Sequence, residues 1–104
     1  MSASAEATVL ITHAVGLHAR PSVKFTKLAK TFAAEVEVAV AANGPWFDAK
    51  SIVKVMAAKA PKGTLLHIRA KGDGAREAVG ALVDLVRRDF DELAKQQMLT
   101  DFEK

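Results

Sequence analysis

The chain has 104 residues, half of them hydrophobic, which is enough to build one compact core in a single domain. It has no cysteine, so disulfides, thiolate nucleophiles and cysteine metal sites are excluded. Its 15 basic and 12 acidic residues give a net charge of +3, a mild excess that suits acidic partners but falls short of a nucleic-acid binder's basic stripe. No stretch approaches the ~20 apolar residues of a membrane span and no signal-peptide pattern opens the chain, so we expect a cytoplasmic protein.

The first half of the chain predicts a strand, a helix and a hairpin. Residues 7–12 form a short, partly β-branched run that is closed by Gly16. This pattern predicts a strand. Pro21 suits a first helical turn, and helical spacing predicts an inner face of Phe25, Leu28, Ala29 and Phe32. Along residues 35–40 every second residue is valine, which predicts a strand with Val36, Val38 and Val40 inward. Asn43 and Gly44 then predict a turn into a short strand that contains Trp46 and Phe47.

The second half predicts a short helix, a strand and the longest helix. Asp48 or Ser51 caps the short helix, Pro61 and Gly63 end it, and its inner side carries Ile52, Val55 and Met56. Residues 64–70 alternate as a strand with Leu66, Ile68 and Ala70 inward. Residues 72–74 form a turn into a helix whose apolar stripe runs from Ala75 through Phe90 to Leu93. Residues 95–104 lose this pattern and are expected to form a loosely ordered tail.

These elements predict an α+β fold of the order βαββαβα. Strands in which polar and apolar residues alternate are covered on one side only. This pattern favours a four-stranded, mostly antiparallel sheet with three helices on one face. The prediction is therefore an open-faced β-sandwich in a single domain, residues 1–104, with its core in residues 5–94.

His18 lies where the loop after the first strand meets the first helix. The opening N–H groups of a helix have no internal acceptors and carry about half a positive charge, so they stabilise an anion attached there. Arg20 adds a cation, and a neutral imidazole can attack phosphorus with its unprotonated nitrogen. A lone histidine beside an arginine is, however, usually a polar surface residue, so this pattern alone leaves both interpretations open.

Two segments add a resemblance to a known family. Residues 16–22 read Gly-Leu-His-Ala-Arg-Pro-Ser, and residues 49–56 read Ala-Lys-Ser-Ile-Val-Lys-Val-Met. The first closely resembles the active-site segment of the HPr family, the histidine-containing phosphocarriers of the bacterial phosphoenolpyruvate-dependent phosphotransferase system. The second resembles that family's other signature, and the resemblance continues to about Phe90.

The resemblance implies a phosphocarrier rather than an enzyme, with the HPr-like open-faced sandwich fold. It implies phosphorylation of His18 on Nδ1, with Arg20 assisting transfer, from Enzyme I to a IIA protein or domain, in sugar uptake or in the related nitrogen branch. It implies no cofactor, and we expect no metal. Ser51 matches a serine that HPr kinase/phosphorylase modifies in some members, although helix capping is an equally good account of it.

The expected docking surface surrounds His18 and the short helix. It comprises Leu17, Ala19, Arg20, Val23, Lys24, Lys27, Ile52, Lys54, Val55 and Met56. We expect a monomer with no membrane insertion and no nucleic-acid partner. The alternative is a small basic nucleic-acid-binding module, but the aromatic residues are spread over different elements instead of lining one strand face.

Overall fold

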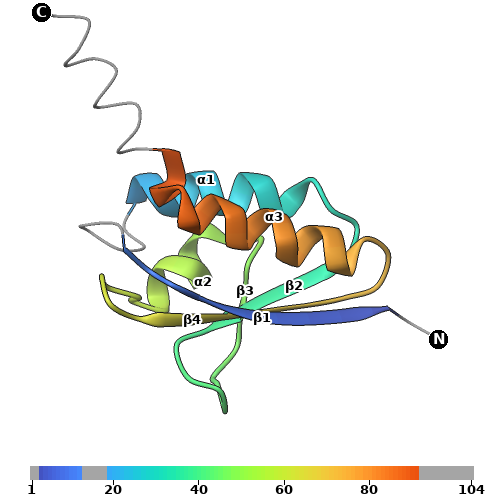
Figure 1. Ribbon diagram of the computed structural model, residues 1–104, viewed down its shortest axis with the longest axis horizontal. Coiled ribbons are helices and arrows are strands. Elements are labelled where there is room, and N and C mark those ends of the chain that lie inside the picture. Colours follow the sequence, from blue (N-terminus) through green and yellow to red (C-terminus); the bar gives the residue numbers. More distant parts are fainter. Residues whose placement is uncertain (1–2, 13–18, 92–104) are drawn as a thin grey trace, which may run out of the picture.

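The computed structural model describes residues 3–12 and 19–91, which form a sheet covered on one face by helices (Figure 1). In chain order the elements are β1 (Ser4–Leu10), α1 (Ala19–Lys30), β2 (Glu35–Ala39), β3 (Phe47–Asp48), α2 (Ile52–Ala57), β4 (Leu65–Lys71), α3 (Ala75–Arg87) and the 3-10 turn η1 (Asp89–Asp91). The strands lie in the order β1-β4-β2-β3, and every pair is antiparallel. The predicted α+β fold, its element order and its three helices are confirmed.

Strand β4 is the centre of the sheet because it pairs along its whole length with β1 and over five residues with β2. Its burial alternates, with Leu66, Ile68 and Ala70 buried beneath the helices, as the sequence predicts. The hairpin prediction is also confirmed, although β3 contributes only two residues opposite β2. None of the helices that the structure describes covers the other side of the sheet, which is called the open face below.

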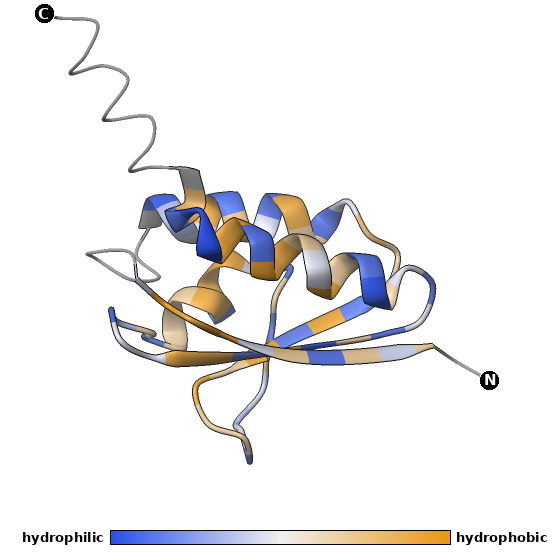
Figure 2. Ribbon diagram, viewed as in Figure 1, coloured by the Kyte–Doolittle hydropathy of each residue, from blue (hydrophilic) through white to orange (hydrophobic). Residues whose placement is uncertain are grey.

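The core lies between this sheet and the inner faces of α1 and α3. Phe25 and Ala29 of α1 are fully buried, whereas Leu28 and Phe32 pack at its margin. Helix α3 buries seven residues against β1, β4 and β2. Figure 2 shows hydrophobic and hydrophilic segments alternating along both helices, which is the expected pattern for helices with one buried face.

Two strand predictions were wrong in detail. The first strand was expected at residues 7–12, but β1 spans Ser4–Leu10, because its limits follow its pairing with β4. Val40 was expected inward, but it is 38% exposed and Ala39 is buried instead. Strand β2 ends at Ala39, so the two-residue period does not continue to Val40.

Two helix ends also differ from the prediction. Helix α2 ends at Ala57, before Pro61, and Lys59 then adopts a left-handed conformation with φ 51°. Helix α3 ends at Arg87, and Asp89 and Phe90 turn the chain with φ of 52° and 57°. Phe90 is still fully buried, but from this turn rather than from a continuing helical stripe. The predictions for Leu93 and the tail at 95–104 lie outside the described residues.

Candidate functional site

Helix α1 begins at Ala19, the residue directly after His18. His18 and Leu17 lie outside the described residues, and the described part of the site is the helix that follows them. Arg20 is exposed in the first turn, and α1 contains no acidic residue along its whole length. The positive end of the helix is therefore not neutralised by any side chain of α1.

Helix α1 is held in place by buried side chains and by hydrogen bonds that two lysines donate to backbone carbonyls. Pro21, Ser22 and Phe25 are buried. Lys24 Nζ donates to the carbonyl of Phe90 at 3.0 Å, which joins α1 to the turn after α3. Lys50 Nζ donates to the carbonyl of Phe32 at 2.7 Å, just beyond the end of α1. The first turn thus belongs to a helix that is held at its middle and just beyond its C-terminal end.

Helix α2 lies against α1 and begins at Ile52, directly after Ser51. Ser51 is the N-cap: its Oγ accepts a hydrogen bond from the backbone N–H of Lys54 at 3.3 Å. Of the two residues proposed from sequence, Ser51 is therefore the cap, whereas Asp48 accepts a hydrogen bond from the N–H of Lys50. Ser51 is a half-buried residue.

The predicted docking residues divide into surface and core. Val23, Lys27, Lys54 and Met56 are exposed, and Lys24 and Ile52 are half-buried. Placing Val55 in the docking surface was wrong, because its side chain is fully buried in the core.

Sequence reasoning missed Val53, which is 72% exposed. The signal was present, because residues two apart on a helix are rotated by roughly 200°, so an inward Val55 directs Val53 outward. We give the name α1–α2 surface to eight exposed or half-buried residues of the two helices: Arg20, Val23, Lys24, Lys27, Ile52, Val53, Lys54 and Met56. It combines apolar side chains with cations and contains no acidic residue.

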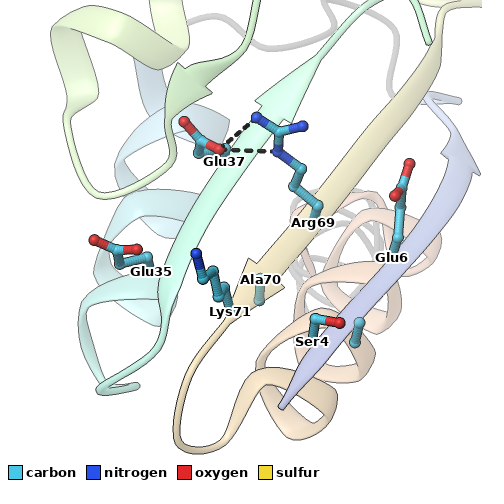
Figure 3. A pocket seen from close by; sticks show the side chains of 8 residues that line it. Ser4, Glu6, Glu35, Glu37, Arg69, Ala70 and Lys71 are labelled. Atoms are coloured by element: carbon cyan, nitrogen blue, oxygen red, sulfur yellow. Dashed lines mark hydrogen bonds and ion pairs between the residues drawn. The ribbon is translucent and has the colours of Figure 1, made fainter. Parts of the chain in front are cut away.

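A second cluster of polar side chains lies on the open face. The Arg69 guanidinium lies 3.8 Å from the centroid of the Trp46 ring, and its Nη2 lies 2.8 Å from a carboxylate oxygen of Glu37. His67 contacts Trp46 edge-on, with ring centroids 6.5 Å apart. Beside this cluster is an open cavity of about 500 Å³ that Glu6, Glu35 and Lys71 also line (Figure 3). Positive and negative side chains both occur there, so this face differs in character from the α1–α2 surface, whose charged residues are all cationic.

Residues 3–12 and 19–91 contain no group of three or more histidine, aspartate or glutamate side chains placed to hold a metal ion. No helix within those ranges is long and apolar enough to cross a membrane.

Comparison with known proteins agrees with this arrangement. The family model for the PTS HPr component phosphorylation site matches residues 5–88. The phosphocarrier protein HPr of Vibrio cholerae is 43% identical over 81 residues, 78% of this chain and 93% of that protein. The HPr of Pseudomonas aeruginosa is 39% identical over 84 residues, 81% of this chain and 92% of that protein.

Solved structures give the same result. A crystal structure of HPr-C-His from Thermoanaerobacter tengcongensis superposes with a TM-score of 0.79 at 36% identity, covering 85% of this chain and 97% of that one. HPr from Bacillus anthracis superposes with a TM-score of 0.72 at 30% identity, covering 79% of this chain and 95% of that one. These matches define the class of protein as a phosphocarrier of the phosphotransferase system rather than a catalyst. The chain belongs to the HPr family.

Proposed function

We propose that His18 accepts a phosphoryl group on Nδ1 from phosphorylated Enzyme I and passes it to a histidine of a IIA protein or domain. In the first step the lone pair of Nδ1 attacks phosphorus. A new N–P bond forms, and the N–P bond to the donor histidine breaks, leaving its electron pair on the donor nitrogen. The second step repeats this exchange with the acceptor histidine, so no cofactor is consumed.

The observation that carries the proposal is the cationic start of α1. The phosphoryl group bears negative charge throughout the transfer, and a helix N-terminus supplies N–H donors and a partial positive charge to such a group. Arg20 is exposed in that first turn, and α1 contains no carboxylate. We assign to Arg20 the stabilisation of the phosphoryl oxygens during transfer.

The α1–α2 surface is the proposed docking site for both Enzyme I and the IIA acceptor. Val23, Val53 and Met56 provide exposed apolar contacts, and the lysines around them attract acidic partners. A carrier must leave each partner quickly, which a small apolar centre with a charged rim allows. The whole chain acts as one carrier domain in the cytoplasm, where phosphoenolpyruvate charges Enzyme I, in sugar uptake or in the nitrogen branch.

Intact mass spectrometry tests the carrier assignment. After incubation with Enzyme I, magnesium and phosphoenolpyruvate, we expect one added phosphoryl group, which brief acid treatment removes because phosphohistidine is acid-labile. His18→Ala removes the addition and leaves the circular dichroism spectrum unchanged. Labelling that persists in His18→Ala, or acid-stable labelling, would assign the phosphoryl group to another residue.

Arg20→Ala separates transfer from docking. If Arg20 acts on the moving phosphoryl group, its loss slows transfer within the complex about tenfold or more and changes affinity for Enzyme I much less. Lys27→Ala, a charge removal two turns along the same helix, is the matched control and should alter mainly affinity. A large affinity loss in Arg20→Ala with unchanged transfer would reduce Arg20 to a docking residue.

Ser51 is the proposed regulatory site, modified by an HPr kinase/phosphorylase. Ser51 is half-buried and lies beside Ile52 and Lys54 of the α1–α2 surface, so a phosphoryl group there adds about −1.5 to −2 charges next to the docking site. Ser51→Asp should weaken binding of Enzyme I. Equal affinity of Ser51→Asp and the unmodified protein would eliminate this electrostatic switch.

A further inference from the structure

Strand β1 forms one edge of the sheet along seven residues, whereas the opposite edge, β3, has only two. The N–H of Gly72 donates to the carbonyl of Ala3, and Ile11 exchanges bonds with residues 63 and 64 next to β4. Because the bonds of an antiparallel ladder alternate along a strand, odd-numbered residues of β1 bond to β4. The N–H and C=O groups of the even-numbered residues therefore point away from the sheet, and no described strand pairs with them: Ser4, Glu6, Thr8 and Leu10.

This edge lacks the features that normally prevent further pairing. Exposed edge strands are usually protected by lysine, proline, a bulge or very short length. Strand β1 reads Ser-Ala-Glu-Ala-Thr-Val-Leu, and its pairing with β4 runs without a bulge from Ser4 to Leu10. Glu6 is its single charge. The edge is thus long, regular and open to another strand.

The C-terminal half of the edge has apolar and cationic neighbours. Leu10 and Leu65 are paired in register on the open face and are 51% and 48% exposed. A shallow cavity of about 310 Å³ runs from these leucines past Thr8 and Val9 to Arg87, in the last turn of α3. Arg87 is exposed, and none of the described side chains pairs with it.

We propose that the edge of β1 binds an extended segment of a partner protein as an additional antiparallel strand, independently of phosphoryl transfer. Residues that lie opposite each other in an antiparallel pair point to the same face. The residue opposite Leu10 covers the two leucines and is aliphatic. The residue opposite Val9 points toward Arg87 and is acidic, and the residue opposite Glu6 is basic. The partner segment therefore reads aliphatic–acidic–any–small–basic.

A synthetic peptide supplies the test. The probe is the blocked peptide Thr-Val-Glu-Thr-Ala-Lys-Thr, added to the ¹⁵N-labelled full chain to about 2 mM, a range that detects weak strand addition. We expect amide shifts centred on Glu6, Thr8 and Leu10, with slower hydrogen exchange at the outward N–H groups. No shift along β1 at that concentration overturns the proposal, as do shifts confined to the α1–α2 surface.

Variants of the edge sharpen the result. Thr8→Pro removes one outward N–H while sparing the hydrogen bonds to β4. It should lower the affinity for the peptide at least tenfold. Thr8→Val keeps that N–H and is the matched control, with affinity unchanged within about twofold. If Thr8→Pro does not fold, Arg87→Glu gives a second test. This variant should bind the original peptide more weakly than the unmodified chain does, and it should bind more tightly a peptide with lysine in place of glutamate. If Arg87→Glu binds the glutamate peptide and the lysine peptide with equal affinity, the assigned register is wrong.

Two further readouts separate this surface from the carrier function and from self-association. Phosphorylation of Thr8→Pro by Enzyme I should match that of the unmodified chain, so failure of either proposal is recognisable independently. If the β1 amides shift with protein concentration in the absence of peptide, the edge pairs with a second copy of the chain and the proposed partner is wrong.

Discussion

At the scale of single residues, Val53 and Val55 lie two positions apart on α2 but in opposite environments. Val55 is fully buried, whereas Val53 is 72% exposed. Val55→Ala removes two methyl groups from the core and should lower the free energy of unfolding by about 2 kcal/mol. The same change at Val53 should stay within about 0.5 kcal/mol. Urea denaturation of both variants measures this contrast, and equal losses would contradict the burial of Val55.

Ser22 is a second residue whose environment has a measurable consequence. Its side chain is fully buried in the first turn of α1, and its hydroxyl has no hydrogen-bond partner among residues 3–12 and 19–91. An unsatisfied buried hydroxyl costs free energy, and alanine is also the better helix former, so Ser22→Ala should stabilise the protein by about 1 kcal/mol.

Thr26→Ala is the comparison for Ser22→Ala, because the Thr26 hydroxyl donates to the carbonyl of Val23 at 3.1 Å. Thermal unfolding should show a higher Tm for Ser22→Ala only. A lower Tm for Ser22→Ala would mean that its hydroxyl is satisfied in solution.

At the scale of elements, the cap of α2 determines how its regulation is tested. Helix α2 has only six residues, so the bond from the Lys54 N–H to Ser51 Oγ is a large part of its N-terminal stabilisation. Ser51→Ala should lower the free energy of unfolding by about 1 kcal/mol, whereas Ser51→Asp retains a capping carboxylate and should cost less. Urea denaturation of the pair measures this difference. An equal loss in both variants would show that weaker Enzyme I binding by Ser51→Asp reflects disturbed structure rather than charge.

At the scale of the whole molecule, the two faces differ in charge. The α1–α2 surface carries cations without acidic residues, whereas the open face mixes both signs. Association with an acidic partner through the first surface should slow about tenfold when salt rises from ~0.05 M to ~0.5 M, because screening removes electrostatic steering.

Charge reversal on each face locates this effect. Lys27→Glu should reduce both the rate of association with Enzyme I and the salt dependence of that rate. Lys71→Glu is the same change on the open face, and it should alter the rate and its salt dependence little. Stopped-flow measurements with Enzyme I provide the rates. If Lys71→Glu has the larger effect, the partner approaches the open face instead.

The sequence by itself determined the order of elements and the family. Periodicity identified α1, β4 and α3 because each has one buried face, and that asymmetry is recorded in the spacing of apolar residues such as Phe25 and Ala29. The local chemistry of capping was also readable, since Ser51 caps α2 as one of two predicted residues. The histidine segment and the second signature indicated the HPr family, which the comparisons confirm.

Only the tertiary structure decided where elements end and what each surface offers. The limits of β1 depend on its ladder with β4, and α3 ends where the chain turns so that Phe90 can enter the core, neither of which is encoded in local spacing. The burial of Val55 and the exposure of Val53 depend on which side of a six-residue helix meets α1 and the sheet. The free edge of β1 is likewise a property of strand order, because a sequence pattern specifies a strand but does not specify whether both of its sides are paired.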